Sequence, residues 1–314
     1  MSKTVMAFGE VLWDILPSCV VLGGAPFNFA YRVNSLGDTG LMVSRLGRDD
    51  LGRRAFDKVV SLGLDTTLLQ WDDDVPTGTV QVSFDAQNNP DYVIVPNVAY
   101  DLIAFAKTLG ETAERADCLC FGTLAQRAPR SRETLMGLME RAQGALMFLD
   151  INLRKACYDQ RRVAFSLQQA DVLKLNEDEA HALGEMLGIR HGTITEFCQA
   201  VVDKWALQFC LVTLGDKGAF GFSLDGQKTY VPGYKVRLAD SLGSGDAFSA
   251  GFVHKVLREA SLDEAVAFGN VLGAIVATQT GATAPMAQGD IDEFLAQKIE
   301  RNVHPEFKAL YGGG

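Results

Sequence analysis

Asp240-Ser241-Leu242-Gly243-Ser244-Gly245-Asp246-Ala247-Phe248 is the stretch that decides the fold of this chain. A strand-like run, residues 234–238, precedes it, and a helix-like run, residues 247–259, follows it. Two glycines leave backbone N–H groups uncrowded, and a helix N-terminus points further N–H groups the same way, so Gly243–Gly245 (the anion turn) is expected to bind an anion. Asp246 adds a carboxylate, which is either a base, as phosphoryl transfer to a hydroxyl requires, or a helix cap.

The composition limits the class of protein. The 314 residues, 47% of them hydrophobic, suffice for one large α/β domain or two domains. Acidic residues outnumber basic ones, 39 to 29, and no Lys/Arg run exceeds two residues, which argues against a nucleic-acid binder. The N-terminus has no signal-peptide pattern, no apolar run approaches ~18 residues, and the six scattered cysteines suit reduced core thiols. We therefore expect a cytoplasmic protein without membrane contact.

Strands and helices are predicted to alternate along the chain. Strands are expected at residues 4–13, 41–46, 118–121, 145–150, 172–175 and 209–214, and helices at 25–36, 51–62, 130–143, 177–187, 194–205, 247–259 and 263–280. This alternation predicts a mostly parallel sheet covered by helices on both faces. Such sheets bind ligands beyond the carboxyl ends of their strands.

One stretch departs from this pattern. Residues 77–85 alternate at period two, a turn is expected at 87–90, and residues 92–95 form a second short strand. An antiparallel hairpin of this kind needs another layer for stability, which part of segment 12–22 could supply. The two segments together predict a small lid sheet.

Three further motifs are candidates for ligand contacts. Asp14 with Gly23, Gly24 and Asn28 offers donors and acceptors for sugar hydroxyls, or forms only a turn and a capped helix. Asn176 and Glu179 suit Mg²⁺ near phosphate, or an acidic helix start. Residues 213–218 can hold phosphate or form a hairpin, and the small-residue face around Asn270 can pack closely or accept a flat ligand such as adenine.

Other catalytic schemes have little support in the sequence. Residues 47–54 resemble a Walker loop but lack its Lys-Ser/Thr, and the anion turn lacks the third glycine of a dinucleotide-binding motif, which argues against a dehydrogenase. The four histidines form no metal-binding pattern, and no Gly-x-Ser-x-Gly elbow is present.

Taken in order, the motifs resemble the ribokinase-like, or PfkB, family of carbohydrate kinases over nearly the whole chain. Residues 240–248 are similar to the C-terminal signature of that family, 22–28 with 36–37 to its sugar motif, and Asn176-x-x-Glu179 to its magnesium motif. Residues 9–14 and 150–154 are most similar to the fructokinase branch. The sequence departs from the commonest signature at Leu242 and Ser244, where the family usually has smaller residues.

The resemblance implies a single ribokinase-like domain over 1–314, with a lid from about 12–22 and 77–100. It implies an ATP-dependent kinase for fructose, with 2-keto-3-deoxygluconate, another sugar or a nucleoside as alternative substrates. A nucleoside would need an aromatic slot, for which Phe27 or Phe29 is available. A non-catalytic sugar sensor is the alternative of a different class. ATP, Mg²⁺ and K⁺ are the implied cofactors, and a homodimer formed through the lid is the implied assembly.

The resemblance also assigns roles to residues. Asp246 would be the base, kept ionised by the helix N-terminus. The remaining assignments are Gly243, Ser244 and Gly245 for the transferring phosphoryl group; Arg154 as a catalytic residue that faces the substrate or the phosphate; Asp14, Gly23, Gly24 and Asn28 for the sugar; Lys174, Asn176, Thr213, Gly215, Gly218 and Asn270 for the nucleotide; Glu179 for Mg²⁺ through water; and Asp240 with Gly281 for a monovalent cation.

Overall fold

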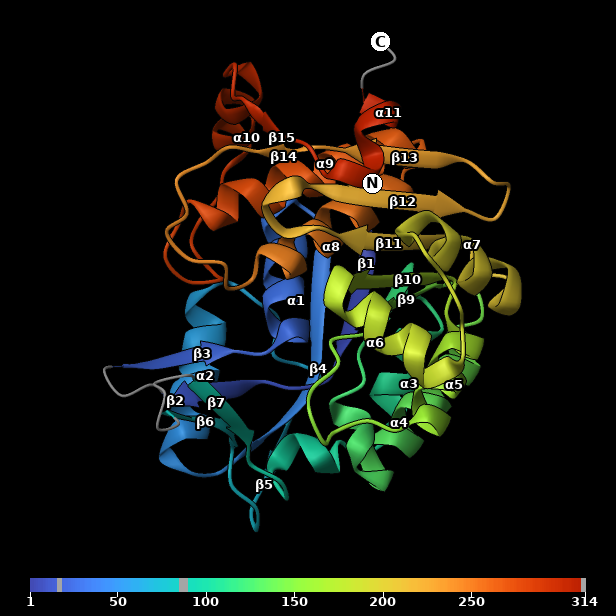
Figure 1. The fold of residues 1–314 in the computed structure, drawn as a ribbon. Helices are drawn as coiled ribbons and strands as arrows, with labels where there is room; N and C mark the ends of the chain where they lie inside the picture. Colours follow the sequence, from blue (N-terminus) through green and yellow to red (C-terminus); the bar gives the residue numbers. More distant parts are fainter. Residues whose placement is uncertain (16–18, 85–89, 312–314) are drawn as a thin grey trace.

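A nine-stranded, mostly parallel sheet forms the centre of the molecule in a computed structural model that describes residues 1–15, 19–84 and 90–311 (Figure 1). Only β12 runs antiparallel to its neighbours. The predicted fold class is confirmed. In spatial order the strands are β13 (Lys228–Val231), β12 (Ala219–Ser223), β11 (Phe209–Thr213), β10 (Val172–Asn176), β9 (Leu146–Asp150), β8 (Cys118–Phe121), β1 (Thr4–Phe8), β4 (Thr39–Gly47) and β5 (Leu69–Asp72).

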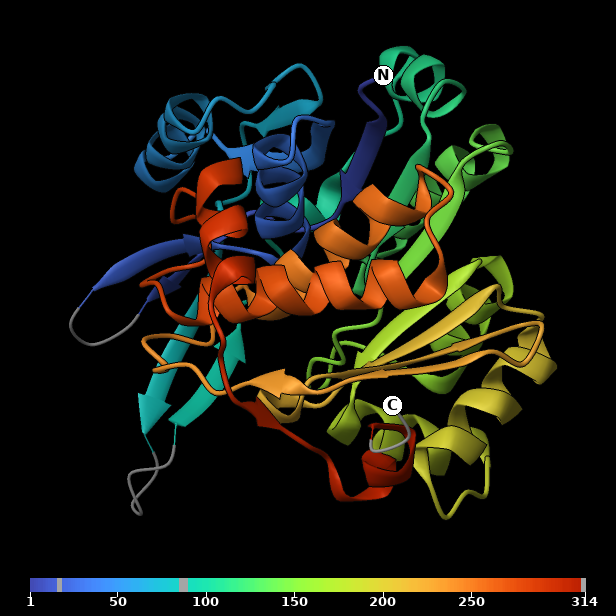
Figure 2. The same cartoon turned by 90° about the horizontal axis from the view of Figure 1, so that it is seen from above.

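Helices cover both faces of this sheet (Figure 2). One face carries α1 (Ala25–Ser35), α2 (Asp50–Ser61), α8 (Ser244–Val256) and α9 (Leu262–Ala277). The other carries α3 (Lys107–Ala113), α4 (Pro129–Arg141), α5 (Gln160–Gln169), α6 (Glu177–Leu187) and α7 (Ile194–Trp205). Alternate residues of β1 enter the two cores, Met6 and Phe8 on one side and Val5 and Ala7 on the other, as expected of a strand buried on both faces.

The chain order creates a switch point at β1. This strand pairs in parallel with β4 on one side and with β8 on the other, so the connections leave it in opposite directions. Residues that follow β1, β8, β9, β10 and β11 therefore meet at one edge of the sheet, beyond the carboxyl ends, where open α/β sheets bind ligands.

A second, four-stranded sheet (the small sheet) lies beside the central one (Figure 1). It has the order β3 (Val20–Gly23), β2 (Leu12–Ile15), β6 (Gly78–Phe84) and β7 (Pro90–Ile94). Segment 12–22 thus pairs with the hairpin strands 78–94, through a parallel β2–β6 ladder. Residues 87–89 of the expected hairpin turn lie outside the described residues.

Two predicted strands were wrong in their bounds. The strand expected over 4–13 ends at Phe8, because Gly9 adopts φ +150°, and Leu12 begins a strand of the small sheet. The strand expected over 234–238 is reduced to β14 (Gly233–Tyr234), which pairs with β15 (Arg301–Asn302) rather than with the central sheet. Helices α3, α5, α10 (Gln288–Ala296) and α11 (Lys308–Tyr311) were not predicted.

The small-residue face of α9 serves close packing in this fold. A Cβ at Gly269 would lie 2.8 Å from Phe248 O, and one at Gly251 would lie 3.0 Å from Gly269 Cα. Helices α8 and α9 therefore approach each other more closely than side chains would allow. Gly273, one turn further along α9, faces a cavity described below.

Candidate functional site

Asp246 lies in the first turn of α8, directly after the anion turn, and its side chain is buried. Asn28, from α1, donates through Nδ2 to Asp246 Oδ2 at 2.8 Å. Burial, reinforced by the nearby charge of Asp150, raises the pKa of Asp246 to about 6, although Lys174, Asn28 and Arg154 oppose the shift. Burial therefore outweighs the helix N-terminus in setting the pKa, although a group with a pKa of about 6 is still mostly ionised at pH 7.

A buried ion pair between Lys174 and Asp150, which the sequence did not predict, packs against the anion turn. Lys174 Nζ, from β10, contacts both carboxylate oxygens of Asp150, at 3.1 and 3.2 Å, and Ser249 Oγ donates to Asp150 Oδ2 at 2.9 Å. A Cβ at Gly245 would lie 3.0 Å from Lys174 Nζ, so the ammonium group touches the turn itself. The position of Asp150 at the end of a predicted strand was the available signal for its place in the site.

Two glycines with positive φ bring the end of β1 against the start of α1. A Cβ at Gly9 (φ +150°) would lie 2.7 Å from Pro26 Cγ, and one at Gly24 (φ +117°) would lie 2.4 Å from Glu10 O. The backbone of Glu10 therefore packs closely against Gly24. This contact fixes the start of α1, which carries Asn28.

The charge of Arg154 influences the pKa values of three acidic residues, Glu10, Asp14 and Asp246. Asp14 belongs to β2 of the small sheet, whereas the strand predicted over 4–13 would have placed it at the end of the first strand of the central sheet. Its Oδ2 lies 3.0 Å from the position that a Cβ of Gly23 would occupy. Burial raises the pKa of Asp14, and it raises the pKa of Glu10 to about 7, with Arg154 opposing both shifts. Arg154, whose side chain is exposed, also lowers the pKa of Asp246, so its positive charge acts on all three acids. Glu10 was missed as a site residue, although it stood inside a quoted motif.

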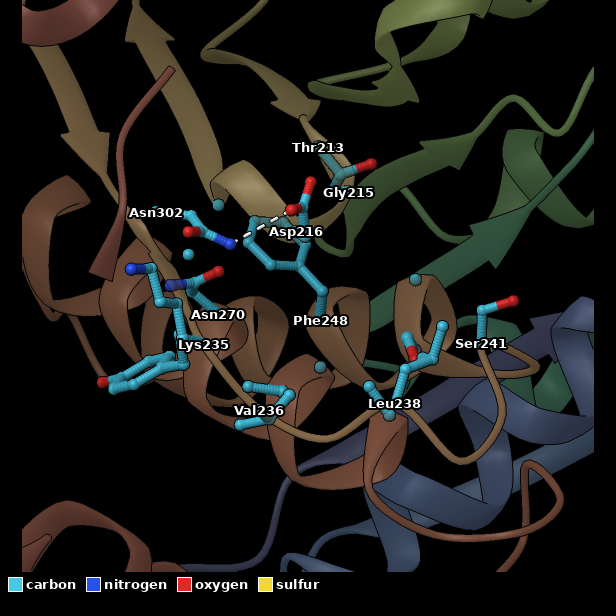
Figure 3. A pocket seen from close by; sticks show the side chains of 18 of the residues that line it. Thr213, Gly215, Asp216, Lys235, Val236, Leu238, Ser241, Phe248, Asn270 and Asn302 are labelled. Atoms are coloured by element: carbon cyan, nitrogen blue, oxygen red, sulfur yellow. Dashed lines mark hydrogen bonds between the residues drawn. The ribbon is translucent and has the colours of Figure 1, made fainter. Parts of the chain in front are cut away.

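A cavity of about 670 Å³ lies beside the anion turn and is lined in part by Ser244 and Gly245 (Figure 3). It contains most of the residues that were predicted for the nucleotide, together with two of the anion turn: Asn176, Thr213, Gly215, Gly218, Asn270, Ser244 and Gly245. Lys235, Val236 and Asn302 also line it and were missed, because the irregular segment after β14 and the C-terminal strand β15 carry no motif. Figure 3 shows the Asn302 side chain donating to Asp216, at 3.0 Å, across one end of this cavity.

Both proposed metal positions already carry internal hydrogen bonds. Glu179 Oε2 accepts from the Asn176 N–H, and its Oε1 accepts from the Leu153 N–H, so Glu179 ties α6 to the segment after β9. Asp240 Oδ1 accepts from the Leu242 N–H, and its Oδ2 accepts from the Gly281 N–H. Among the described residues, no group of three or more His, Cys, Asp or Glu side chains could hold a metal ion. A carboxylate oxygen keeps a lone pair after one such bond, so Glu179 still fits a water-mediated role.

The two phenylalanines of α1 do not form an open aromatic slot. Phe27 is fully buried in the core, and Phe29 stacks on Phe148 of β9 with ring centroids 6.2 Å apart. A nucleoside base would therefore find neither ring face exposed, which removes the feature that had kept a nucleoside substrate open.

Comparisons with known proteins agree with this arrangement. A family model described as pfkB family carbohydrate kinase matches residues 20–288. The chain is 30% identical to fructokinase-1 of Oryza sativa subsp. japonica over 308 residues, which cover 90% of this chain and 94% of the relative. A fructokinase with bound ATP from Xylella fastidiosa superposes with a TM-score of 0.79 at 23% identity, covering 94% of this chain and 98% of that one. A sugar kinase from Pyrococcus horikoshii in complex with ATP superposes with a TM-score of 0.77 at 25% identity and the same coverage.

Proposed function

Because this chain belongs to the pfkB family of carbohydrate kinases, we propose that it transfers the γ-phosphoryl group of ATP to a hydroxyl group of D-fructose. Its class is that of a sugar kinase, a phosphotransferase with an alcohol group as acceptor. One observation carries the proposal: the buried Asp246 carboxylate lies at the start of α8, directly after the anion turn, and Ser244 and Gly245 of that turn line the large cavity.

Asp246 would accept the proton of the attacking sugar hydroxyl. A pKa of about 6 leaves it mostly ionised at pH 7 and makes it a better base than an exposed aspartate. Asn28 holds one carboxylate oxygen, which leaves the other for the substrate. The backbone N–H groups of Gly243–Gly245 and the dipole of α8 would stabilise the charge on the transferring phosphoryl group.

The cavity is the proposed ATP site. Asn270 and Phe248, which line the cavity, suit a flat base, while Asn176, Thr213 and the N–H groups of Ser244 and Gly245 suit phosphates. Lys174, beneath Gly245, would add positive charge there. A magnesium ion brought by ATP would neutralise phosphate charge, and Asn176 and Glu179 would orient its water ligands.

Electrostatics on the sugar side support a neutral sugar. The positive charge of Arg154 opposes the raised pKa of Glu10, Asp14 and Asp246, so these three acids compete for its influence. A polyhydroxy sugar such as fructose can donate hydrogen bonds to these carboxylates. The carboxylate of 2-keto-3-deoxygluconate would have to compete with them for Arg154, which makes that acid sugar the second candidate.

The small sheet is proposed to act as a lid over the sugar, since β2 supplies Asp14. By excluding water it would suppress wasteful ATP hydrolysis. We also propose a homodimer formed through this sheet, which a measurement of the size in solution would test. We assign the protein to the cytoplasm, where ATP is available and where the buried thiols of Cys118 and Cys120 would stay reduced. Among the described residues, no helix is long and apolar enough to cross a membrane.

The decisive experiment measures ADP release with fructose, ribose, 2-keto-3-deoxygluconate and adenosine, and compares kcat/KM for each. We expect fructose to give the highest value and the Asp246→Asn variant to lose turnover with every substrate. A higher kcat/KM for 2-keto-3-deoxygluconate would move the assignment to the acid sugar. If no substrate is turned over, while binding is still detected by calorimetry, the protein would be a sugar sensor.

A further inference from the structure

Arg32 is the largest fully buried side chain of the described residues, with 1% of its surface exposed. It lies on α1 one turn beyond Asn28, and therefore on the same face of that helix. Its Nη2 donates to two backbone carbonyls of the segment after α9, Ala282 O at 3.0 Å and Ala284 O at 3.2 Å. Two successive turns of α1 thus contact Asp246, the proposed base, and the segment 281–284.

The guanidinium is unusually short of partners. Its Nε and Nη1 find no hydrogen-bond acceptor within the described part of the chain, and no carboxylate there forms an ion pair with it. Its Cζ lies 5.3 Å from the ring centre of Tyr31, which adds a cation–π contact. Burying a cation without a counter-ion costs stability, so this arrangement calls for a compensating role.

The segment that Arg32 holds is the support of the anion turn. A Cβ at Gly243 would lie 2.4 Å from Ala282 Cβ, so the turn and this segment are packed backbone against side chain. The Gly281 N–H donates to Asp240 Oδ2 at 3.2 Å, which ties the same segment to the start of the turn. Any displacement of Ala282 is therefore passed directly to the groups that would bind the phosphoryl group.

We propose that Arg32 is a built-in cation that holds segment 281–284 against the anion turn and takes the place of the monovalent ion expected near Asp240 and Gly281. The carbonyls of Ala282 and Ala284 already accept hydrogen bonds from the guanidinium, and the positive charge held there disfavours a second cation at the same oxygens. The positive charge of Arg32 adds to the partial positive charge of the N–H groups in the anion turn. A phosphate bound at that turn would supply the counter-charge that Arg32 lacks.

This inference rests on phosphoryl transfer at the anion turn, and the first test separates the two. Turnover of the wild-type protein is measured with ATP and fructose in tetramethylammonium buffer, with and without 100 mM KCl as a probe. We expect turnover in both, with kcat changed less than ~2-fold by K⁺. A K⁺ stimulation of ~10-fold or more would overturn the role of Arg32 while leaving the kinase intact. Absence of turnover in both buffers would count against the kinase instead, and the ADP-binding test below would then decide on Arg32.

The second test uses substitutions at Arg32 and has a readout besides turnover. Arg32→Ala is expected to weaken ADP binding, measured by calorimetry in tetramethylammonium buffer, by ~10-fold or more, and to lower kcat similarly. Adding guanidinium ion or K⁺ at low millimolar concentration should restore part of both losses, because the vacated space lies between the same carbonyls. Unchanged ADP affinity and kcat in Arg32→Ala would overturn the proposal.

A matched control separates this role from a loss of fold. Arg258, which follows α8, is more exposed than Arg32; it pairs with Asp38 at 2.6 Å and does not line the cavity. Arg258→Ala should lower the melting temperature without changing ADP affinity or the response to K⁺. If Arg32→Ala does not fold, Arg32→Lys keeps the charge but not the two-carbonyl contact. Reduced kcat with unchanged cation dependence is then expected, and wild-type kcat would overturn the proposal.

Discussion

Asp246→Asn should make the protein inactive and, at the same time, more stable. The pKa of Asp246 is raised from 3.8 to about 6 in the folded protein, so the ionised carboxylate is less favourable there than in the unfolded chain. A shift of about 2 units corresponds to about 3 kcal/mol of lost stability once the pH exceeds 6. A neutral asparagine of the same shape avoids this cost, and it can still accept from Asn28 through its amide oxygen.

The sign of the pH dependence follows from the raised pKa. Below pH 3.8 the aspartic acid is protonated in both states and the variant gains nothing; the gain grows between pH 4 and 6 and is complete above the folded pKa. We expect urea unfolding to give a stabilisation of about 3 kcal/mol at pH 8 and less than about 1 kcal/mol at pH 4. The kcat of the variant should fall by ~10² or more.

Asp49→Asn is the control of opposite sign. Although burial opposes it, hydrogen bonds from Thr77 and Gly52 lower the pKa of Asp49, so the neutral variant should lose stability at pH 8 and less of it at pH 4. A loss of stability in Asp246→Asn at pH 8, or a gain equal at both pH values, would refute the assignment of Asp246 as a desolvated carboxylate. Near-normal turnover would refute its assignment as the base.

Two further predictions concern the surroundings of the anion turn. Asp150→Asn removes one of the charges that raise the pKa of Asp246, so the acid limb of the pH–kcat profile should shift below pH 6. The unpaired Lys174 should also cost about 3 kcal/mol of stability, measured by urea unfolding. An acid limb that does not move would contradict the electrostatic coupling between Asp150 and Asp246. Gly243→Ala places a Cβ 2.4 Å from Ala282 Cβ at φ +78° and should lower the free energy of unfolding by about 1–3 kcal/mol. Gly281→Ala, at φ +81° with no atom within 4 Å, should lower it by about 1 kcal/mol. Equal losses in urea unfolding would show that the contact with Ala282 does not matter.

The sequence predicted the central sheet and the anion turn because both depend on local signals. Alternating strands and helices are predicted from hydrophobic periodicity, and closely spaced glycines such as Gly243 and Gly245 are a local signal for a turn before a helix. The break after Phe8 could not be read in this way, because Val11 and Trp13 continue the apolar pattern. It arises from the contacts of Gly9 with Pro26 and of Gly24 with Glu10, which exist only in the folded chain.

Burial of charge was the other feature that sequence reasoning missed. Arg32 is an ordinary polar residue within a helix pattern, and its contacts with Ala282 and Ala284 join segments 250 and 252 residues apart. Asp150 and Lys174 likewise belong to different strands and meet because those strands pair side by side. A local pattern carries no information on which distant backbone will cover a charged side chain.

The connections of the small sheet have a mechanical consequence. Only residues 9–11 separate β1 from β2, and only Gly24 separates β3 from α1, so there is almost no slack between the small sheet and the core. A tilt of that sheet must be absorbed at Gly9 and Gly24 or must turn α1 about its axis. Since α1 carries Asn28 and Arg32 on successive turns, a rotation of this helix would move its contacts with Asp246 and with Ala282 together, and would couple the small sheet to the anion turn.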